Sequence, residues 1–171
     1  MINMYDVYMG VDNGVSGTIG IIDTVSKKVE FIKTPVKKPE QDYTKKKSNI
    51  TRLDFLRFKT LLELYKDTKI LIIFERPMIN NTRFIASKTG LRCWEAQLIC
   101  VEILCLPYII LDSKEWQKKM LPKGISKEEL KTASLQISNK IFPQFKDFKH
   151  PDRDGLLIAE YQRRLELGYW K

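Results

Sequence analysis

The feature that most constrains the fold is a short apolar run, KILIIF at residues 69–74, that is followed by an acid. A continuous stretch of β-branched and aromatic residues suits a central strand that is buried on both faces of a sheet. Pro77 ends the run, so Glu75 lies at the carboxyl end of the predicted strand, while adjacent Arg76 points to the opposite face. An ionised carboxylate in that place needs a cation. The partner is either a distant lysine in a structural salt bridge or a bound metal ion.

Strand and helix patterns fill the rest of the chain. Strand patterns cover four further segments: residues 5–11, 17–23, 28–33 and 107–111. Asn13–Gly14 and Gly17 supply hairpin chemistry between the first two. Helical spacing or a helix start signal predicts five helices: residues 53–65 with Asn49 or Thr51 as N-cap, about 82–104, a short helix after Asp112 or Ser113, 126–141 from the capping box Ser126–Glu129, and a last helix with Pro151 in its first turn.

This order of elements predicts a mixed α/β domain. Three antiparallel strands followed by two parallel ones would form a five-stranded sheet, flanked by helices on both faces. A length of 171 residues suits one domain that spans residues 1–171. Residues 34–49 lack apolar periodicity and are expected to form a Lys- and Pro-rich loop, which is either a solvated charged face or a DNA-contacting segment.

The charge balance points to a polyanionic partner. Lys and Arg exceed Asp and Glu by 30 to 21, which gives a formal net charge of +9. This excess favours nucleic acid or an anionic membrane surface, unless it is only a compositional bias toward Lys. No secretory signal is visible, and no apolar run approaches the roughly 20 residues of a membrane span. Three cysteines without metal-ligand spacing (Cys93, Cys100 and Cys105) are expected to be reduced core thiols, so the chain is predicted to be intracellular, in the cytoplasm.

Acidic side chains and one histidine stand where predicted strands and helices end. Asp12 ends the first strand pattern, and Gly14 beyond it allows a tight turn and a close approach to a large anion. Asp154 opens the apolar part of the last helix, and His150 stands four residues earlier, about one helical turn. Asp152 would be turned away from Asp154 in a regular helix. Each residue also has a structural alternative, a hairpin turn for Asp12 and helix capping for the others.

These residue types indicate a site for hard divalent metal ions. Carboxylates with a single imidazole favour Mg²⁺ or Mn²⁺ over zinc, and one histidine excludes a His-rich zinc site. Two such ions about 3.5–4 Å apart would activate water and stabilise the leaving oxygen of a phosphodiester. No serine or cysteine nucleophile arrangement competes, and no GxxxxGK[ST] loop is present.

Four segments in this order resemble RuvC-like Holliday-junction resolvases of the ribonuclease-H-like superfamily, in the phage and plastid branch: GVDNGVSGTIGIID, IIFERP, LRCWEAQLICVEILCLPYIILDSKEWQKKML and HPDRDGLLIAEYQRR. The resemblance covers nearly the whole chain. It implies a ribonuclease-H-like fold, a homodimer, two Mg²⁺ or Mn²⁺ ions per active site, and paired symmetric nicks in four-way DNA junctions. A phage-encoded chain would act in the host cytoplasm.

Carried over by position, the resemblance implies a metal-binding and catalytic group: Asp12, Glu75, His150 and Asp154. Lys118 or Lys119 falls where related enzymes place a catalytic lysine near the scissile phosphate. His150 would be the fourth metal ligand or the general base. Two departures leave Asp152 open as the fourth ligand instead. Gly155 replaces the usual Ala, and Pro151-Asp152-Arg153 replaces a linker of the Gly-Arg-Ala type.

The resemblance also implies residues for DNA contact: Lys45, Lys46, Lys47, Met78, Arg83, Phe84, Lys88, Arg92 and Lys119. Met78 or Phe84 is the candidate for an apolar wedge in the junction, and the alternative is that both are core residues. Three residues of the helix after the central strand are expected at the dimer interface, unless they only pack on the sheet: Trp94, Leu98 and Val101.

Three other functions fit parts of the pattern. A sugar-kinase or actin-like ATPase would cradle phosphate with DNGVSGT, but that fold needs two lobes, and 171 residues with one Gly-rich turn are too few. Another ribonuclease-H-like nuclease would cut flaps or RNA–DNA hybrids. A catalytically silent module would bind branched DNA without cutting it.

Overall fold

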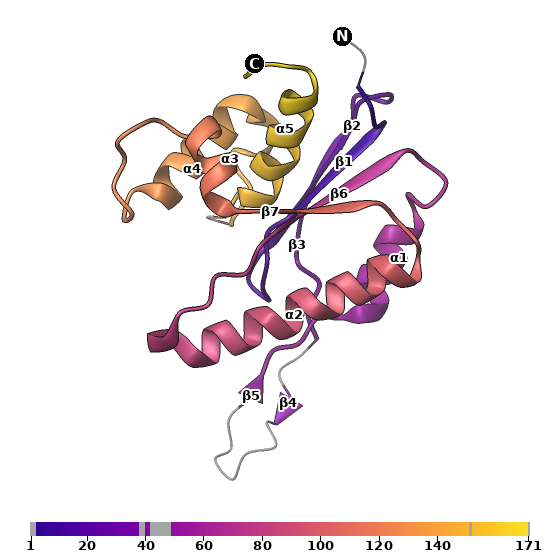
Figure 1. Cartoon of the computed structure of the whole chain (residues 1–171), viewed down its shortest axis with the longest axis vertical. Coiled ribbons are helices and arrows are strands. Elements are labelled where there is room, and N and C mark those ends of the chain that lie inside the picture. Colours follow the sequence, from indigo (N-terminus) through magenta and orange to yellow (C-terminus); the bar gives the residue numbers. More distant parts are fainter. Residues whose placement is uncertain (1–2, 38–39, 42–48, 151, 171) are drawn as a thin grey trace.

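Five strands form one mixed sheet in the computed structural model, which describes residues 3–37, 40–41, 49–150 and 152–170 (Figure 1). In sheet order they are β3 (Val29–Lys33), β2 (Thr18–Asp23), β1 (Val7–Val11), β6 (Ile70–Glu75) and β7 (Tyr108–Leu111). The first three are antiparallel neighbours, and β1–β6 and β6–β7 pair in parallel. The predicted five-stranded mixed sheet is confirmed.

Helices cover both faces of the sheet because its strands send alternate apolar side chains to opposite sides. In β6, Ile72 and Phe74 belong to one core, and Leu71 and Ile73 belong to the other. By the same alternation Glu75 faces the second core. The first core lies under α1 (Phe55–Glu63) and α2 (Phe84–Ile103), and the second under α3 (Ser113–Met120), α4 (Leu130–Ile141) and α5 (Asp154–Glu166) (Figure 1).

Helix α5 lies directly on β1 and β2 because glycines remove the side chains between them. A Cβ on Gly10 would come within 2.2 Å of the Gly155 carbonyl oxygen, and one on Gly20 within 2.5 Å of the Leu156 backbone. A Cβ on Gly155 would lie 2.6 Å from the Thr18 carbonyl oxygen. This contact explains why glycine stands where the resembled family has Ala, and it seats the first turn of α5 at the carboxyl end of β1.

The predicted start of α1 is wrong, and that of α3 is confirmed. Asp54 caps α1, not Asn49 or Thr51, and its side chain accepts a hydrogen bond from the Arg57 N–H at 3.3 Å. Asp112 caps α3, as one of the two predicted alternatives.

The last two helices begin later than their start signals predict. The Glu129 carboxylate does accept a hydrogen bond from the Ser126 N–H at 2.9 Å, but residues 127–129 form a turn and α4 begins at Leu130. The last helix, α5, begins at Asp154, and Pro151 lies outside the described residues.

The Lys- and Pro-rich segment is partly extended rather than a simple loop. Val36 forms an isolated β-bridge with Leu53, and the Asp54 N–H donates to the Pro35 carbonyl oxygen at 2.9 Å. These contacts hold the chain extended as far as Asp54, which is why α1 does not begin earlier. Two short strands, β4 (Glu40–Gln41) and β5 (Asn49–Ile50), pair antiparallel. The predicted DNA contacts Lys45, Lys46 and Lys47 lie outside the described residues.

Two expectations drawn from composition concern the thiols and the membrane. Cys93 and Cys100 are buried, as predicted, but Cys105 is exposed and is not a core residue. Burial raises the pKa of Cys93 to about 12 and that of Cys100 to about 11, so both thiols stay protonated at neutral pH. Among the residues that the structure describes, no helix has both the length and the apolar character that a membrane crossing requires.

Candidate active site

The register of two parallel strands brings two acids together. Val11 of β1 pairs with Phe74 of β6, so the next residues, Asp12 and Glu75, are neighbours at the carboxyl ends of these strands. Both are 8% exposed. Beyond Asp12 the chain turns back into β2 through Gly14, which has φ of +100°, a conformation that glycine adopts without strain.

Polar neighbours hold Glu75 in place. Trp116 of α3 is fully buried, and its indole Nε1 donates to Glu75 Oε1 at 2.9 Å. Asn13 Nδ2 donates to Oε2 at 3.3 Å, and the carboxyl of Asp12 shares a hydrogen bond with Glu75. Sequence reasoning assigns no site role to Trp116 or Asn13. The available signal is that a buried indole needs an acceptor, and a strand-end carboxylate is one.

The start of α5 supplies two more carboxylates. Asp152 Oδ1 accepts hydrogen bonds from Thr18 Oγ1 at 3.0 Å and from the Asp154 N–H at 2.9 Å. Asp154 Oδ1 accepts a hydrogen bond from Ser134 of α4. Because α5 begins only at Asp154, Asp152 lies before the helix and is not turned away from the site, which corrects the expectation from helical spacing.

A buried arginine organises the chain that leads into α5. Arg153 is 1% exposed, and its guanidinium donates to four backbone carbonyl oxygens: Phe148 at 2.8 Å, Asp152 at 3.1 Å, Phe145 at 3.2 Å, and His150. The guanidinium carbon lies 5.1 Å from the centre of the Phe31 ring. Arg153 stands between Asp152 and Asp154, so these contacts set the direction from which both carboxylates enter the site. No sequence pattern marks it, because arginine is rarely buried.

Four carboxylates share one electrostatic environment: Asp12, Glu75, Asp152 and Asp154. Burial raises the pKa of Asp12 well above its ordinary value, and the charges of the other three add to the shift. Burial also raises the pKa of Glu75, against the opposing effect of the Trp116 hydrogen bond. For Asp154, burial and then the nearby Asp152 raise the pKa to about 7. The site is therefore a concentration of negative charge that protons or cations must neutralise.

The donor set fits hard divalent cations. Within the described part of the chain, none of the four carboxylates forms a salt bridge with Lys or Arg. Buried oxygen donors of like charge are the ligands that Mg²⁺ and Mn²⁺ prefer. In the present side-chain positions, no three His, Cys, Asp or Glu groups of the described residues are placed to hold one ion. Asp12 bonds to Glu75 and Asp154 to Ser134, so ion binding competes with these hydrogen bonds.

Of the two candidates for a fourth ligand, the geometry favours Asp152 over His150. Asp152 is the nearby charge that most raises the pKa of each of the other three carboxylates. His150 Nδ1 instead accepts a hydrogen bond from the Asp152 N–H at 3.3 Å. Lys118 is exposed on α3, and the cation that lowers the pKa of Asp154 is Lys131 of α4, which sequence reasoning misses. Roles for His150 and Lys118 stay predictions.

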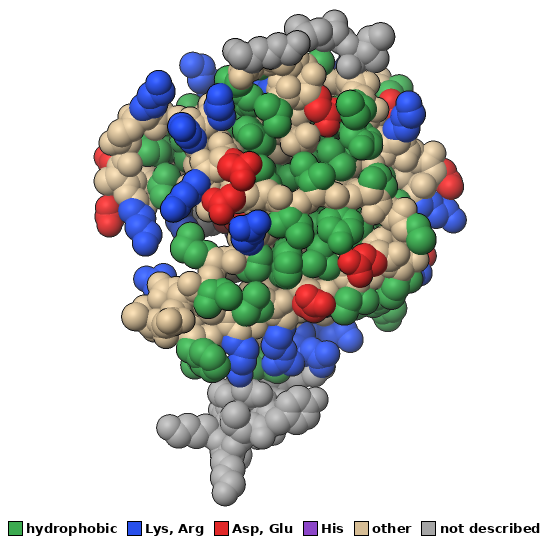
Figure 2. All heavy atoms as spheres, viewed as in Figure 1, with side chains coloured by type: hydrophobic (Ala, Val, Ile, Leu, Met, Phe, Trp, Pro, Cys, Tyr) green, Lys and Arg blue, Asp and Glu red, His purple; other side chains and the backbone are tan. Residues whose placement is uncertain are grey.

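A polar cleft of about 420 Å³ borders the site loop, which is the loop after β1 that carries Asp12 and Asn13, on the side of α2. Its lining includes Asn13, Met78, Arg83, Gly90 and Lys127. Figure 2 shows the molecule hollowed between α3–α4 and the N-terminal end of α2, with Lys and Arg side chains gathered on the α3–α4 side.

The structure places the other predicted DNA contacts on the surface. Met78 and Phe84 are 69% and 70% exposed, so neither is a core residue. Arg92 is exposed and Lys88 is half-buried on α2, and Lys119 is exposed on α3. Contact with DNA stays a prediction for all of them.

The predicted dimer residues divide between core and surface. Leu98 and Val101 are buried against the sheet, as the alternative to an interface role expects, and their role at an interface stays a prediction. Trp94 is half-buried beside an apolar hollow of about 460 Å³ on α2. The large apolar residues that α2 exposes are others: Phe84, Ile85, Ile99 and Ile103.

A scan against protein-family models finds no match, and a search of curated proteins finds none either. Solved structures do match. One is T. thermophilus RuvC in complex with a Holliday junction substrate, at 14% identity and a TM-score of 0.55, over 96% of this chain and 94% of that one. Another T. thermophilus RuvC structure has the same identity and coverage with a TM-score of 0.48. The chain therefore has a RuvC-like, ribonuclease-H-like fold, as its sequence predicts.

Proposed function

We propose that this chain is a divalent-metal-dependent nuclease of one domain that cuts four-way DNA junctions by paired symmetric nicks. The observation that carries the proposal is the convergence of four carboxylates at the carboxyl ends of the central strands of a RuvC-like fold, where burial and neighbouring charges raise the pKa of Asp12, Glu75 and Asp154. Such a cluster is costly to keep beside an open cleft unless it binds cations. The matched RuvC structure holds a Holliday junction, which makes that substrate the first to test.

The ligands that we propose for two Mg²⁺ or Mn²⁺ ions are the four acids: Asp12, Glu75, Asp152 and Asp154. When bound, such ions polarise the scissile phosphate and activate the attacking water. The chain's own residues orient the ligands. Trp116 and Asn13 direct the two oxygens of Glu75, and Ser134 holds one oxygen of Asp154. Each of these contacts joins different elements, so the site depends on the whole fold.

The substrate would be held by charge and shape rather than by base sequence. Arg83 and Lys127 line the cleft beside the site loop, where their charges suit backbone phosphates. Met78, in the loop before α2, and Phe84, the first residue of α2, are exposed and are the candidates for apolar contact with unstacked bases at the branch point. Selectivity then follows from branch geometry and DNA deformability.

A homodimer is part of the proposal, because two symmetric nicks need two sites related by a two-fold axis. We place the interface on the outer side of α2 and the adjoining β7. Ile99, Ile103 and Ile110 are exposed there, and Ile99 lines the same hollow as Trp94. Figure 2 shows hydrophobic side chains gathered over α2 and β7 on this face.

The test is incubation of the chain with Mg²⁺ and matched four-way, flap, RNA–DNA hybrid and linear duplex substrates. We expect symmetric nicks in the four-way junction. Asp12→Asn and Glu75→Gln should each lower the rate about 100-fold or more, because each removes a charged ligand, and should leave junction binding intact. Asp67→Asn changes an exposed acid outside the cluster and should cut like the unchanged chain.

Other outcomes separate the alternatives. Cleavage of flaps or hybrids alone would identify a different ribonuclease-H-like nuclease. Junction binding without cleavage in Mg²⁺ or Mn²⁺ would identify a silent binding module. Full activity of both carboxylate variants would refute the site.

A further inference from the structure

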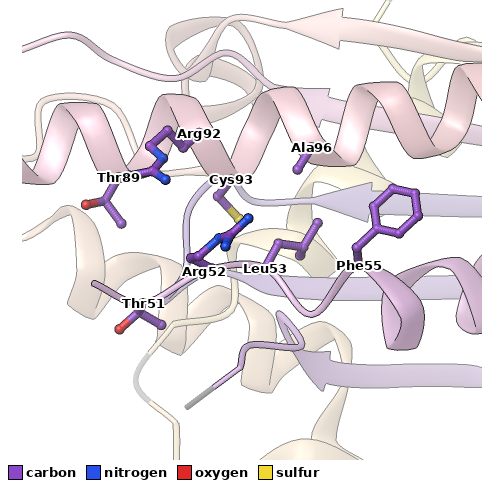
Figure 3. Close-up of a pocket in the computed structure, with 8 residues that line it drawn as sticks. All are labelled: Thr51, Arg52, Leu53, Phe55, Thr89, Arg92, Cys93 and Ala96. Atoms are coloured by element: carbon purple, nitrogen blue, oxygen red, sulfur yellow. The ribbon is translucent and has the colours of Figure 1, made fainter. Parts of the chain in front are cut away.

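A second pocket, of about 270 Å³, lies between α2 and the segment that leads into α1 (Figure 3). Its floor is apolar: Leu53, Phe55, Cys93 and Ala96. Its mouth is polar and basic: Thr51, Arg52, Thr89 and Arg92. In Figure 3, Thr89 and Arg92 reach from α2, and Arg52 reaches from the opposite wall, toward the same opening. The proposed catalytic cluster uses none of these side chains.

Backbone contacts fix both walls of this pocket. The Lys37 N–H donates to the Arg52 carbonyl oxygen at 3.0 Å, and the Asp54 N–H donates to the Pro35 carbonyl oxygen at 2.9 Å. These bonds hold the wall that carries Arg52 extended. The other wall is the middle of a 20-residue helix. The pocket is therefore formed before any ligand binds, which lowers the entropic cost of binding.

The mouth has the chemistry of a phosphate site. Two guanidinium groups with planar donor arrays suit phosphate oxygens. Within the described residues, Arg92 has no ion-pair partner. Asp54, on the same wall as Arg52, pairs with Arg57 at 3.4 Å. The apolar floor keeps water from beneath the bound group and strengthens its attraction to the guanidinium groups.

This pocket adjoins the loop that carries Asp12. Cys93 on its floor bonds to the backbone of Gly14. Three residues earlier on α2, Gly90 lines the cleft, and a Cβ there would lie 3.7 Å from Asn13 Oδ1. Three residues of helix span roughly 4.5 Å, and a DNA strand rises about 3.4 Å per nucleotide. A strand at the catalytic cluster therefore reaches this pocket within a few nucleotides.

We propose that the pocket binds a backbone phosphate of the DNA strand that is cut, a few nucleotides from the scissile bond. The inference rests on the proposed function and adds to it the place where the strand is anchored. A phosphate contact of this kind positions the strand and reads no base.

The first measurement is junction affinity over a salt series, with Glu75→Gln present in every protein to prevent cleavage. Arg92→Gln should weaken binding about 5- to 10-fold at 0.1 M salt and reduce the slope of log K against log salt by about 0.9, because one phosphate contact is lost. Arg52→Gln should act in the same direction, and Arg92→Lys should recover part of the slope. Lys66→Gln removes an equal charge from an exposed residue just before β6 begins, and it should change neither quantity. Melting temperatures check that each variant is folded.

The second measurement locates the phosphate. Neutral methylphosphonate linkages replace the phosphates that flank the mapped cut, one at a time. At one position we expect the methylphosphonate to lower junction affinity as much as Arg92→Gln does. Combining that linkage with Arg92→Gln should cause no further loss of affinity. If the affinity losses from Arg92→Gln and from methylphosphonate add fully at every position, the proposed phosphate site is refuted. It is also refuted if inorganic phosphate blocks DNA binding while no single methylphosphonate position weakens it. If the Glu75→Gln protein binds junctions no better than linear duplex, the proposed function fails instead.

Discussion

At the scale of single residues, the site depends on an acid that regular helical spacing would turn away. Asp152 bonds to Thr18 and to the N–H of Asp154, and its charge acts on each of the other three carboxylates. His150 bonds to the backbone of Asp152 and therefore supports the site from outside. Asparagine at 152 would keep both accepted hydrogen bonds and lose only the charge.

We predict that Asp152→Asn lowers the single-turnover rate of junction cleavage about 100-fold or more, because it removes the charge of a proposed metal ligand. His150→Ala should cost about 10-fold or less, because it removes only a contact to the backbone that carries the ligand. The two rates are compared at saturating enzyme and Mg²⁺. A larger loss for His150→Ala than for Asp152→Asn would reassign the fourth ligand to the imidazole.

Asp154 makes the stability of the metal-free protein depend on pH. Burial and Asp152 raise its pKa from an ordinary 3.8 to about 7, so the folded state binds the proton more tightly than the unfolded chain does. The tighter proton binding of Asp154 contributes stability that is complete below pH about 4 and is lost as the pH rises through about 7. We predict a melting temperature several degrees lower at pH 8 than at pH 5.5, and a smaller difference when Mg²⁺ is present.

The control for this pH effect is Asp154→Asn, which keeps an acceptor for Ser134 and removes the titrating group. It should raise the stability of the metal-free protein at pH 8 by about 1 kcal/mol, or about 2–4 °C for a chain of this size. Its stability should depend less on pH and respond less to Mg²⁺. An unchanged pH dependence would show that other groups control stability in this range.

At the scale of elements, the sequence predicts the sheet well because its strands are almost wholly apolar and their ends carry turn residues. It predicts helix starts less well, because contacts between distant segments override local capping signals. The bridge between Val36 and Leu53 keeps the chain extended past Thr51, so Asp54 is the residue that caps α1. These contacts join residues that no local pattern relates.

The same distinction holds for the site. Asp12, Glu75 and Asp154 can be found from sequence because each follows or opens a regular apolar element. Trp116 and Ser134 cannot, because their partners lie 41 and 20 residues away in the chain. Only the packing of α3 and α4 against the sheet brings those donors to the carboxylates.

The packing of α5 on the sheet gives a prediction at this scale. In Gly155→Ala the new Cβ would lie 2.6 Å from the Thr18 carbonyl oxygen and 2.8 Å from the Gly20 nitrogen, which are backbone atoms. We expect a loss of stability of about 2 kcal/mol or more in denaturant unfolding, with a loss of cleavage because Asp154 moves with the helix.

The matched control for this prediction is Gly90→Ala. Its Cβ would meet only Asn13 Oδ1, at 3.7 Å, and alanine in a helix interior should add up to about 1 kcal/mol of stability. Equal stability of Gly155→Ala and the unchanged chain would mean that α5 lies farther from β2 than these distances indicate.

At the scale of the whole molecule, the proposal assigns DNA binding to the basic surface and dimerisation to the exposed apolar surface. The net charge of +9 includes the acids that the site concentrates in one place, so the rest of the surface is more basic than the total suggests. Phosphate contacts of this kind weaken steeply with salt. The apolar surface on α2 and β7 carries no such salt dependence, so dimerisation should persist at salt concentrations that release DNA.

Ile103→Arg tests the proposed dimer, because it puts a charge on a residue that is 62% exposed at the proposed interface. A stable dimer of this kind buries about 800 Å² per partner, and a charge inside it has no partner. We expect the variant to sediment as a monomer and to convert a cruciform plasmid mainly to nicked circles, whereas the unchanged chain gives linear product from paired nicks. Val25→Arg adds the same charge at an exposed turn far from α2 in the chain and should leave both results unchanged. If the Ile103→Arg variant is still a dimer, the two-fold axis lies at another surface. If a monomer gives linear product, paired nicks do not require a dimer.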